Sequence, residues 1–229
     1  MMIESHKKAA AFLIEIKNKA AEKLKNRISE RNLAKFILSE YKKRKIKSSG
    51  KPKVIVAFGK NTSEIHHFPK NDRLAEGPVI LDLWAKQKNG CFADLTWTLY
   101  KGNPSKSFES AFKTAVEARN KALSFLKKCL KKKYLPTMVE IDSIARSYLA
   151  EKRLGYAFMH RVGHMLWKKV HADNKKGYYE RLRLNVPYAL EPGIYFKGKF
   201  GIRIENDFWI DEHFKLHLTE IQNKLLLVS

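Results

Sequence analysis

The stretch VILDLWAKQKNGCFADLTWT, residues 79–98, has the pattern of two strands joined by a tight turn. The apolar runs at 78–85 and 91–100 have the composition of strands, and the KQKNG between them has the composition of a hairpin turn. This stretch therefore predicts a β-hairpin, and the rest of the chain can be interpreted outward from it.

Each strand of the predicted hairpin carries one carboxylate at a position that otherwise looks buried. Asp82 lies inside the first run, and Asp94 lies in the second, on the same face as Thr96 and Thr98 by period-two alternation. Two carboxylates that face each other across neighbouring strands repel unless something positive lies between them. They are either edge charges in water or ligands of a cation. The apolar flanks favour the cation, because buried carboxylates are rare unless they are paired or metal-bound.

The segments on both sides of the hairpin predict two similar halves. Helices are expected at 6–26 and after Ser29, and again at 106–133 and from Thr137 to a C-terminal Gly155. Further strand-like runs lie at 53–58, 189–196, 200–210, 214–218 and 224–228. The order helix, helix, strands therefore occurs twice. It favours an α+β fold in which helices cover one face of a sheet, with pseudo-halves at about 1–101 and 102–229.

Composition excludes several classes of protein. The chain has 229 residues, 44% of them hydrophobic, so it is not a disordered chain despite a formal net charge of +23. No apolar run is long enough to span a membrane, and the first residues lack a signal-peptide core. Cys91 and Cys129 provide no disulfide framework, which favours a reducing compartment and a cytoplasmic protein.

The positive charge is concentrated in the segments that are expected to be helical. The net charge is +11 over 1–53 and +7 over 102–159, but only +1 over 54–101 and +4 over 160–229. One interpretation is a basic face that binds nucleic acid. The other is solvated lysine on exposed helix faces, and it is favoured because Lys outnumbers Arg 35 to 11 and lacks the bidentate fork of Arg.

The second half adds histidines and acidic residues to the two aspartates. His160, His164 and His171 lie in HRVGHMLWKKVHAD, Glu191 lies in LEPGIYF, and Glu205 lies in GIRIEND. Each histidine alone would be interpreted as an ordinary core residue. Four carboxylates with one or more imidazoles on separate elements instead suit a pair of divalent cations, which requires bridging carboxylates.

These motifs, together with VIVAFGKNTSEIHHFP, resemble the pita-bread metallopeptidases: aminopeptidase P, prolidase and methionine aminopeptidase. EPGIY and GIRIE are more similar to the first two. The resemblance covers nearly the whole chain. It implies a curved antiparallel sheet with helices over it, in a single catalytic domain, 1–229, without the extra N-terminal domain of many relatives. It also implies a dinuclear exopeptidase that hydrolyses short peptides at Xaa-Pro bonds by a metal-bridging hydroxide.

The resemblance also implies a role for each site residue. Asp82 would chelate one metal ion, Asp94 and Glu205 would bridge both ions, and His164 and Glu191 would complete the second. Glu191 would also carry a proton to the leaving amine, and His171 would stabilise the oxyanion. For the remaining roles, the resemblance implies His66, with His67 as the other candidate, His160 at the pocket wall, and Arg203 as a brace for Glu205. Mn²⁺ is favoured, with Co²⁺, Zn²⁺ or Fe²⁺ as alternatives.

The sequence departs from the family pattern at four positions, which are Trp97, Met165, Trp167 and Ala172. None of them is an implied metal ligand, so they bear on rate and specificity. Two alternatives remain open. One is an activity like that of methionine aminopeptidase. The other is a non-catalytic member of the fold that binds RNA or protein through its basic face, although all five ligand positions are retained. Homodimerisation is left open, nucleic acid is a secondary partner, and no membrane partner is expected.

Overall fold

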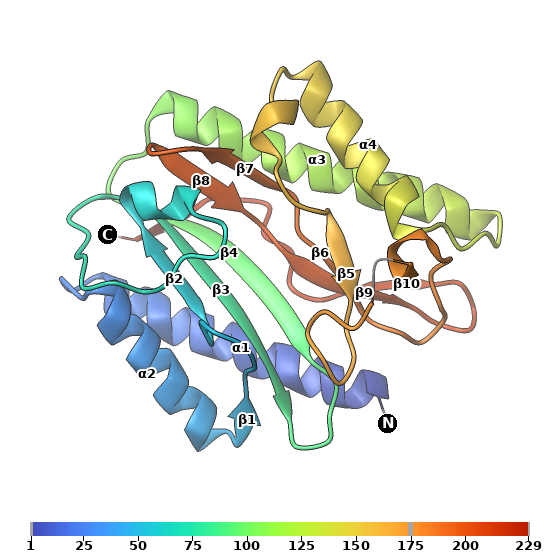
Figure 1. Ribbon diagram of the computed structural model, residues 1–229, viewed down its shortest axis with the longest axis horizontal. Coiled ribbons are helices and arrows are strands. Elements are labelled where there is room, and N and C mark those ends of the chain that lie inside the picture. The colour runs from blue at the N-terminus through green and yellow to red at the C-terminus, as the bar shows by residue number, and fades with distance from the viewer. Residues whose placement is uncertain (1, 174–175, 229) are drawn as a thin grey trace.

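The computed structural model describes residues 2–173 and 176–228. Two long helices followed by strands occur twice along the chain, as expected from the sequence (Figure 1). The first half contains α1 (Met2–Leu24), α2 (Glu30–Lys43), β1 (Ile46–Lys47), β2 (Ile55–Phe58), β3 (Gly77–Gln87) and β4 (Ala93–Lys101). The second contains α3 (Lys106–Lys131), α4 (Met138–Glu151), β5 (Gly163–Met165), β6 (Tyr188–Leu190), β7 (Gly193–Phe196), β8 (Phe200–Arg203), β9 (Asn206–Ile210), β10 (Leu216–Leu218) and β11 (Leu226–Val228). Among the described residues, no helix is both long and apolar enough to cross a bilayer.

The helices begin where their capping residues predict. The Ser29 side chain accepts a hydrogen bond from the Asn32 amide at the start of α2. Thr137 and Glu140 form a capping box at the start of α4. The expected helix end at Gly155 is wrong. Arg153 takes the left-handed conformation just after α4 (φ 58°), and Gly155 begins a short 3₁₀ helix, η2 (Gly155–Ala157).

The hairpin at 79–98 forms as predicted, and its two faces differ. Strands β3 and β4 pair antiparallel, with Asp82 opposite Thr96 and Trp84 opposite Asp94. Apolar side chains of one face pack against α1 and α2, and they include Val79, Leu81, Leu83, Ala93, Leu95, Trp97 and Leu99. Alternation therefore leaves Asp82 and Asp94 on the opposite face, away from α1 and α2.

The two long strand-like runs of the second half are each interrupted at an acidic residue. The run 189–196 divides into β6 and β7, with Glu191 between them, and the run 200–210 divides into β8 and β9, with Glu205 between them. Strands β6 and β9 pair in one sheet with β5 and β10, while β7 and β8 form a separate hairpin. Each glutamate therefore lies at a break between sheets and not inside a regular strand.

The two halves meet along β4. The Glu205 amide donates to the Thr96 carbonyl (2.9 Å), and the Arg203 amide donates to the Thr98 hydroxyl (3.2 Å). The last strand, β11, returns to the first half and pairs with β4 in parallel. The expectation of a purely antiparallel sheet is therefore wrong at this strand. This return ties the chain end to the first core. Helices α3 and α4 cover the second.

Candidate metal centre

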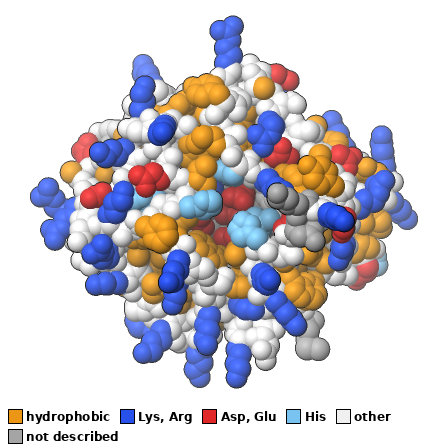
Figure 2. All heavy atoms as spheres, viewed as in Figure 1, with side chains coloured by type: hydrophobic (Ala, Val, Ile, Leu, Met, Phe, Trp, Pro, Cys, Tyr) orange, Lys and Arg blue, Asp and Glu red, His pale blue; other side chains and the backbone are white. Residues whose placement is uncertain are grey.

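The face of the hairpin that carries Asp82 and Asp94 forms the floor of a pocket of about 460 Å³. Acidic and histidine side chains gather in a hollow at the centre of this face, while most lysine and arginine side chains surround it (Figure 2). The pocket contains every residue that the family resemblance implied as a ligand or as a participant in the chemistry: His66, Asp82, Asp94, His160, His164, His171, Glu191, Arg203 and Glu205. Residues from both halves of the sequence therefore converge on one site.

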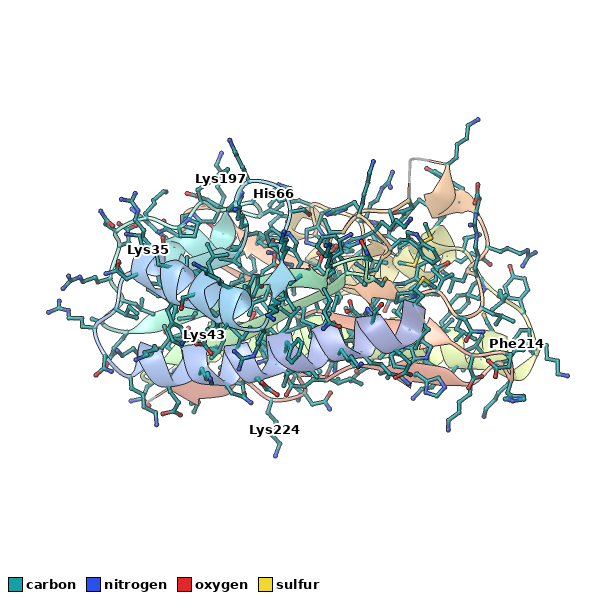
Figure 3. The ribbon with its side chains drawn as sticks, turned by 90° about the horizontal axis from the view of Figure 1, so that it is seen from below. Lys35, Lys43, His66, Lys197, Phe214 and Lys224 are labelled. Carbon is teal, nitrogen blue, oxygen red and sulfur yellow. The ribbon has the colours of Figure 1, made fainter. Side chains whose placement is uncertain are left out.

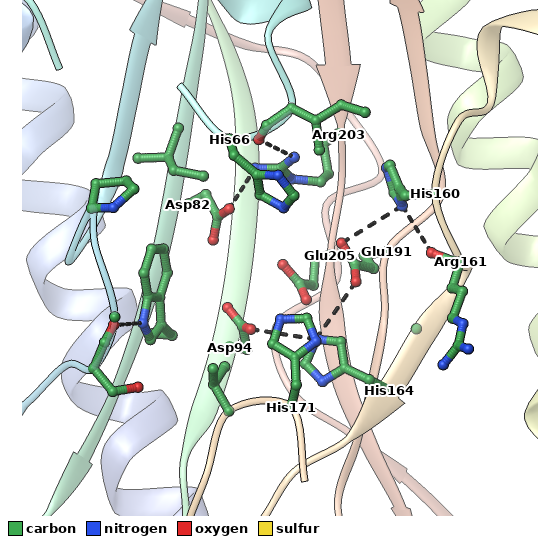
Figure 4. Close-up of a pocket in the computed structure, with 18 of the residues that line it drawn as sticks. His66, Asp82, Asp94, His160, Arg161, His164, His171, Glu191, Arg203 and Glu205 are labelled. Atoms are coloured by element: carbon green, nitrogen blue, oxygen red, sulfur yellow. Dashed lines mark hydrogen bonds and ion pairs between the residues drawn. The ribbon is translucent and has the colours of Figure 1, made fainter. Parts of the chain in front are cut away.

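The five expected ligands come from five different places in the fold (Figure 4). Ligand atoms of Asp94, His164 and Glu205 all lie within 4.8 Å of one another, as a shared cation requires. The His164 Nε2 atom is 3.6 Å from Asp94 Oδ2 and 3.5 Å from Glu191 Oε1. Asp82 lies beside this group on β3. These distances are short enough for the carboxylates and the imidazole to bind the same cations.

Several buried carboxylate oxygens in this cluster have no hydrogen-bond partner within the described part of the chain. They are Asp82 Oδ1, Asp94 Oδ1 and Glu205 Oε1. A buried acceptor without a partner is costly, and a charged one is more so. Because each of the three carboxylates directs a free oxygen into one pocket, the set fits hard divalent cations bound through oxygen.

Burial and mutual repulsion raise the pKa of these carboxyl groups. The pKa of Asp94 lies well above its usual range because of burial and the nearby charges of Glu205 and Asp82. Burial also raises the pKa of Glu205, and among its charged neighbours Glu191 raises it most. Removal from bulk water raises the pKa of Glu191 to about 8, although Arg203 opposes the shift. Bound cations would compensate this excess of negative charge.

Burial favours the neutral form of His164 and of His171. Burial lowers the pKa of His164 to about 3, and the neighbouring His171 adds to the shift. The two rings stack with centroids 4.0 Å apart. Burial also lowers the pKa of His171. Neutral imidazole is the form that binds metals, so His164 is prepared to act as a ligand at neutral pH.

The structure separates the two histidine candidates after the first strand. His66 lines the pocket, whereas His67 is buried outside it between Glu30 and Glu64, at 2.8 Å and 2.7 Å. Burial alone would lower the pKa of His67, but these two carboxylates raise it. His67 is therefore part of a buried ion pair, and only His66 can reach a molecule in the pocket.

A chain of hydrogen bonds orients the wall of the pocket around Arg203. The His160 Nδ1 atom lies 2.8 Å from the Arg161 carbonyl, which can only accept, so Nδ1 carries the proton. Burial holds the pKa of His160 at about 4, so the ring is neutral and Nε2 accepts from the Tyr195 hydroxyl (2.8 Å). That hydroxyl in turn accepts from Arg203 Nη1 (3.0 Å).

The side-chain partner of Arg203 is not the expected one. It forms an ion pair with Asp82, and its Nε donates to the Thr96 hydroxyl, which donates to Glu205 (2.7 Å). The expected direct brace of Glu205 is therefore replaced by an indirect contact through Thr96. The reason is the break before Glu205, which ends the strand alternation that would have placed both side chains on one face.

Sequence reasoning missed two buried polar groups behind the site. Asp207 Oδ2 accepts from the Asp94 amide (3.0 Å), and His6 of α1 lies 3.5 Å from the same oxygen. The Asp207 signal was present in GIRIEND, two residues after Glu205. The His6 signal was not, because a single histidine in an amphipathic helix has no distinguishing pattern. Together they connect the first helix to the backbone of a predicted ligand.

The four departures from the family pattern lie outside the lining of this pocket, as far as the described residues show. Trp97 points to the helix-covered core and donates to Glu220, as expected for a core residue. Trp167 and Ala172 line other surface hollows, and Met165 packs against the second core. Trp84, in contrast, is pocket wall, beside the segment 49–52.

Comparison with known families agrees with this arrangement. The model of metallopeptidase family M24 matches residues 2–212. The chain belongs to metallopeptidase family M24. An uncharacterized peptidase of Staphylococcus epidermidis is 29% identical over 210 residues, which are 90% of this chain and 58% of that protein. The Xaa-Pro dipeptidase of Pyrococcus horikoshii is 30% identical over 175 residues, 75% of this chain and 48% of that one.

Solved M24-like structures have the same fold. The X-Pro aminopeptidase of Thermotoga maritima superposes with a TM-score of 0.85 at 26% identity, covering 99% of this chain and 62% of that chain. Recombinant prolidase of Thermococcus sibiricus gives a TM-score of 0.85 at 29% identity, with 98% and 60% covered. The pita-bread α+β fold is thereby confirmed. This M24 chain spans about half to three fifths of the length of these relatives.

Proposed function

We propose that this M24 chain is a dinuclear metal-dependent exopeptidase, a single catalytic domain that hydrolyses short peptides at Xaa-Pro bonds. The observation that supports it most is the cluster of Asp94, His164 and Glu205, with ligand atoms within 4.8 Å, beside Asp82 and Glu191 in one pocket. The similarity to an Xaa-Pro dipeptidase and to an X-Pro aminopeptidase supports the bond preference.

The residues present fit a pair of divalent cations. Asp82 and Asp94 would hold one cation and His164 with Glu191 the other, and Asp94 and Glu205 would be shared. Two such cations lower the pKa of a shared water and polarise the substrate carbonyl. A set of oxygen ligands with one imidazole favours Mn²⁺ but also accepts Co²⁺, Zn²⁺ or Fe²⁺.

The protein groups around the cations have separate tasks in this proposal. Glu191, whose Oε1 lies 3.5 Å from the His164 Nε2 atom, accepts a proton from the attacking water and passes it to the leaving amine. His171, stacked on His164, faces the carbonyl oxygen and donates to it as negative charge develops. His66 and His160 form the pocket wall that orients the peptide.

Replacing His171 with alanine tests its assigned task. We expect kcat to fall about 10²- to 10³-fold, because one donor to the developing oxyanion is lost. His171 is not a proposed ligand, so the Mn²⁺ affinity, measured by titration calorimetry, should change less than threefold. Equal losses in metal affinity and activity would show that His171 acts on the metal site and not on the carbonyl.

A peptide panel tests the function itself. The protein is treated with chelator, reloaded with Mn²⁺ or Co²⁺, and given Ala-Pro, Ala-Pro-Ala, Ala-Ala-Ala and Met-Ala-Ser. We expect both cations to restore cleavage, with kcat/KM for the two proline peptides at least about tenfold above the others. Preferred cleavage of Met-Ala-Ser would indicate a methionine aminopeptidase-like activity. Full metal loading without cleavage of any peptide would contradict the proposal and favour a binding protein.

A further inference from the structure

A second hollow, of about 970 Å³, opens beside the metal pocket. It lies between η1 (Gly59–Ser63), η2 and the turn that joins β7 to β8. The two hollows share Ile65 and His66 in their linings, so they adjoin at this edge of the site. We call the second hollow the lysine-rimmed groove. A molecule held in the metal pocket can extend into it past His66.

The groove has an apolar wall that the described part of the chain leaves exposed. Tyr156 is 72% exposed and Met159 is 53% exposed, and Tyr195 and Phe196 complete the wall. Large exposed apolar side chains in a concave patch mark binding surfaces more often than neutral surface. Tyr195 also belongs to the hydrogen-bond chain of His160 and Arg203, so one residue connects the wall to the catalytic pocket.

The rim of the groove is strongly basic. Its lining includes Lys60, Lys70, Lys197 and Lys199 but only one acidic residue, Glu64. Lys70 lies 3.5 Å from Glu64, and no ion pair is found for the other three lysines among the described residues. The side chains of His66 and Lys197 project on the same side of the molecule (Figure 3). The rim therefore presents unpaired positive charge next to the site.

We propose that the lysine-rimmed groove binds the part of a peptide substrate that lies beyond the residue after the scissile bond, and that it favours acidic side chains there. This inference rests on the proposed exopeptidase function. An exopeptidase that removes the first residue leaves the remainder of the peptide outside the metal pocket, and that remainder needs a surface. The groove supplies apolar contact for the side chains of this part and lysines for its acidic side chains.

Charge decides the class of substrate. The metal cluster itself is acidic and is neutralised by its cations, so selectivity for a charged peptide must come from the rim. Exposed lysine–carboxylate contacts are individually weak, but several acting together steer a charged ligand and weaken as salt is added. Peptides of four or more residues with acidic positions after proline should therefore be better substrates than dipeptides or neutral peptides of the same length.

The test compares three peptides on three forms of the Mn²⁺-loaded protein. The peptides are Ala-Pro, Ala-Pro-Ala-Gln-Gln and Ala-Pro-Ala-Glu-Glu. The first variant is Lys197→Glu with Lys199→Glu. The matched control is Lys215→Glu with Lys224→Glu, which changes the net charge equally but lies outside both hollows; the Lys224 side chain projects on the side opposite Lys197 (Figure 3).

We expect the groove variant to lower kcat/KM for the acidic pentapeptide about tenfold and to leave Ala-Pro within twofold. The control variant should match wild type on all three peptides. In wild type, added salt should reduce the preference for the acidic peptide. Equal kinetics of the acidic and neutral pentapeptides, or equal losses in both double variants, would overturn the proposal.

A binding measurement separates this inference from the proposed function. Fluorescence anisotropy with the labelled acidic pentapeptide requires no turnover. If wild type cleaves no peptide, the exopeptidase proposal fails, and the groove is judged by binding alone. Binding about tenfold weaker in the groove variant supports the groove, and unchanged binding overturns it. A labelled RNA that binds through Lys197 and Lys199, with no difference between the peptides, would also overturn it.

Discussion

Replacing Glu205 with alanine is expected to abolish metal-dependent peptide hydrolysis, with a loss of at least about a thousandfold in kcat/KM. Glu205 is buried, carries an unpaired oxygen, and lies within ligand distance of Asp94 and His164. Cation catalysis is worth several kcal/mol, and each 1.36 kcal/mol corresponds to a factor of ten in rate. The measurements are steady-state hydrolysis of Ala-Pro and a Mn²⁺ titration by calorimetry, which should show fewer or weaker sites.

The folded state of this variant provides an independent check. Because Glu191, Asp82 and Asp207 repel the Glu205 charge, the metal-free variant should be at least as stable at pH 8 as the metal-free wild type. The matched control is Glu212→Ala, which removes an exposed carboxylate far from the pocket lining and should keep activity within twofold. Activity above a tenth of wild type in Glu205→Ala would contradict the assignment of Glu205 as a ligand.

The stability of the metal-free protein is expected to fall between pH 6.5 and pH 8. Folded-state pKa values of Glu191, Asp94 and Glu205 are raised, Glu191 to about 8. Groups of this kind stabilise the fold below their unfolded pKa, and this contribution is lost as the pH rises through the folded pKa. The free energy of unfolding should fall by about 1.4 kcal/mol per pH unit for each extra proton that the folded state holds.

Histidines act in the opposite direction below pH 6.5. His6, His160 and His164 have folded pKa values of about 4, 4 and 3, lowered by burial, so the unfolded chain binds protons first as the pH falls. Their contribution is lost from about pH 6.5 downward. Below pH 6.5 the carboxyl groups and the histidines therefore oppose each other, so the free energy of unfolding should change less per pH unit between pH 5.5 and pH 6.5 than between pH 6.5 and pH 8. Urea unfolding at pH 5.5, 6.5 and 8.0 measures this curve.

Cations should change the alkaline side of that curve. Mn²⁺ at 100 times its dissociation constant adds about 2.7 kcal/mol by mass action, and its binding should release protons at pH 6.5. We expect Mn²⁺ to stabilise the protein more at pH 8 than at pH 6.5, and Glu205→Ala to reduce the decline of the metal-free form. A metal-free stability that rises steadily from pH 6.5 to pH 8 would show that the carboxyl groups are already ionised in the fold.

Much of the site could be predicted because its residues stand out locally. Asp82 and Asp94 interrupt apolar strands, and the alternation along the hairpin is enough to place both on the face that points away from α1 and α2. The sequence favours His66 over His67 as a site residue, and of the two only His66 lines the pocket. Predictions of this kind are possible because they depend on neighbours within a few residues along the chain or directly across a hairpin.

Other features could not be predicted because they depend on contacts between distant segments. The indirect brace of Glu205 through Thr96 requires the break in the chain before Glu205, and the parallel return of β11 requires β4 to be in place. The contact of His6 with Asp207 joins residues about 200 positions apart. No pattern within α1 marks this contact.

The family and the α+β order of elements could be read from the sequence, and the five ligands could be predicted from it, because hydrophobic alternation and residue chemistry are local properties. The packing of distant segments sets which oxygens remain unpaired, raises the carboxyl pKa values, and places a groove rimmed by lysines next to the pocket at His66. Desolvation and electrostatic repulsion depend on distances between side chains that only packing sets. The β3–β4 hairpin provides the two aspartates, and the second half of the chain adds the histidines and glutamates that complete the site.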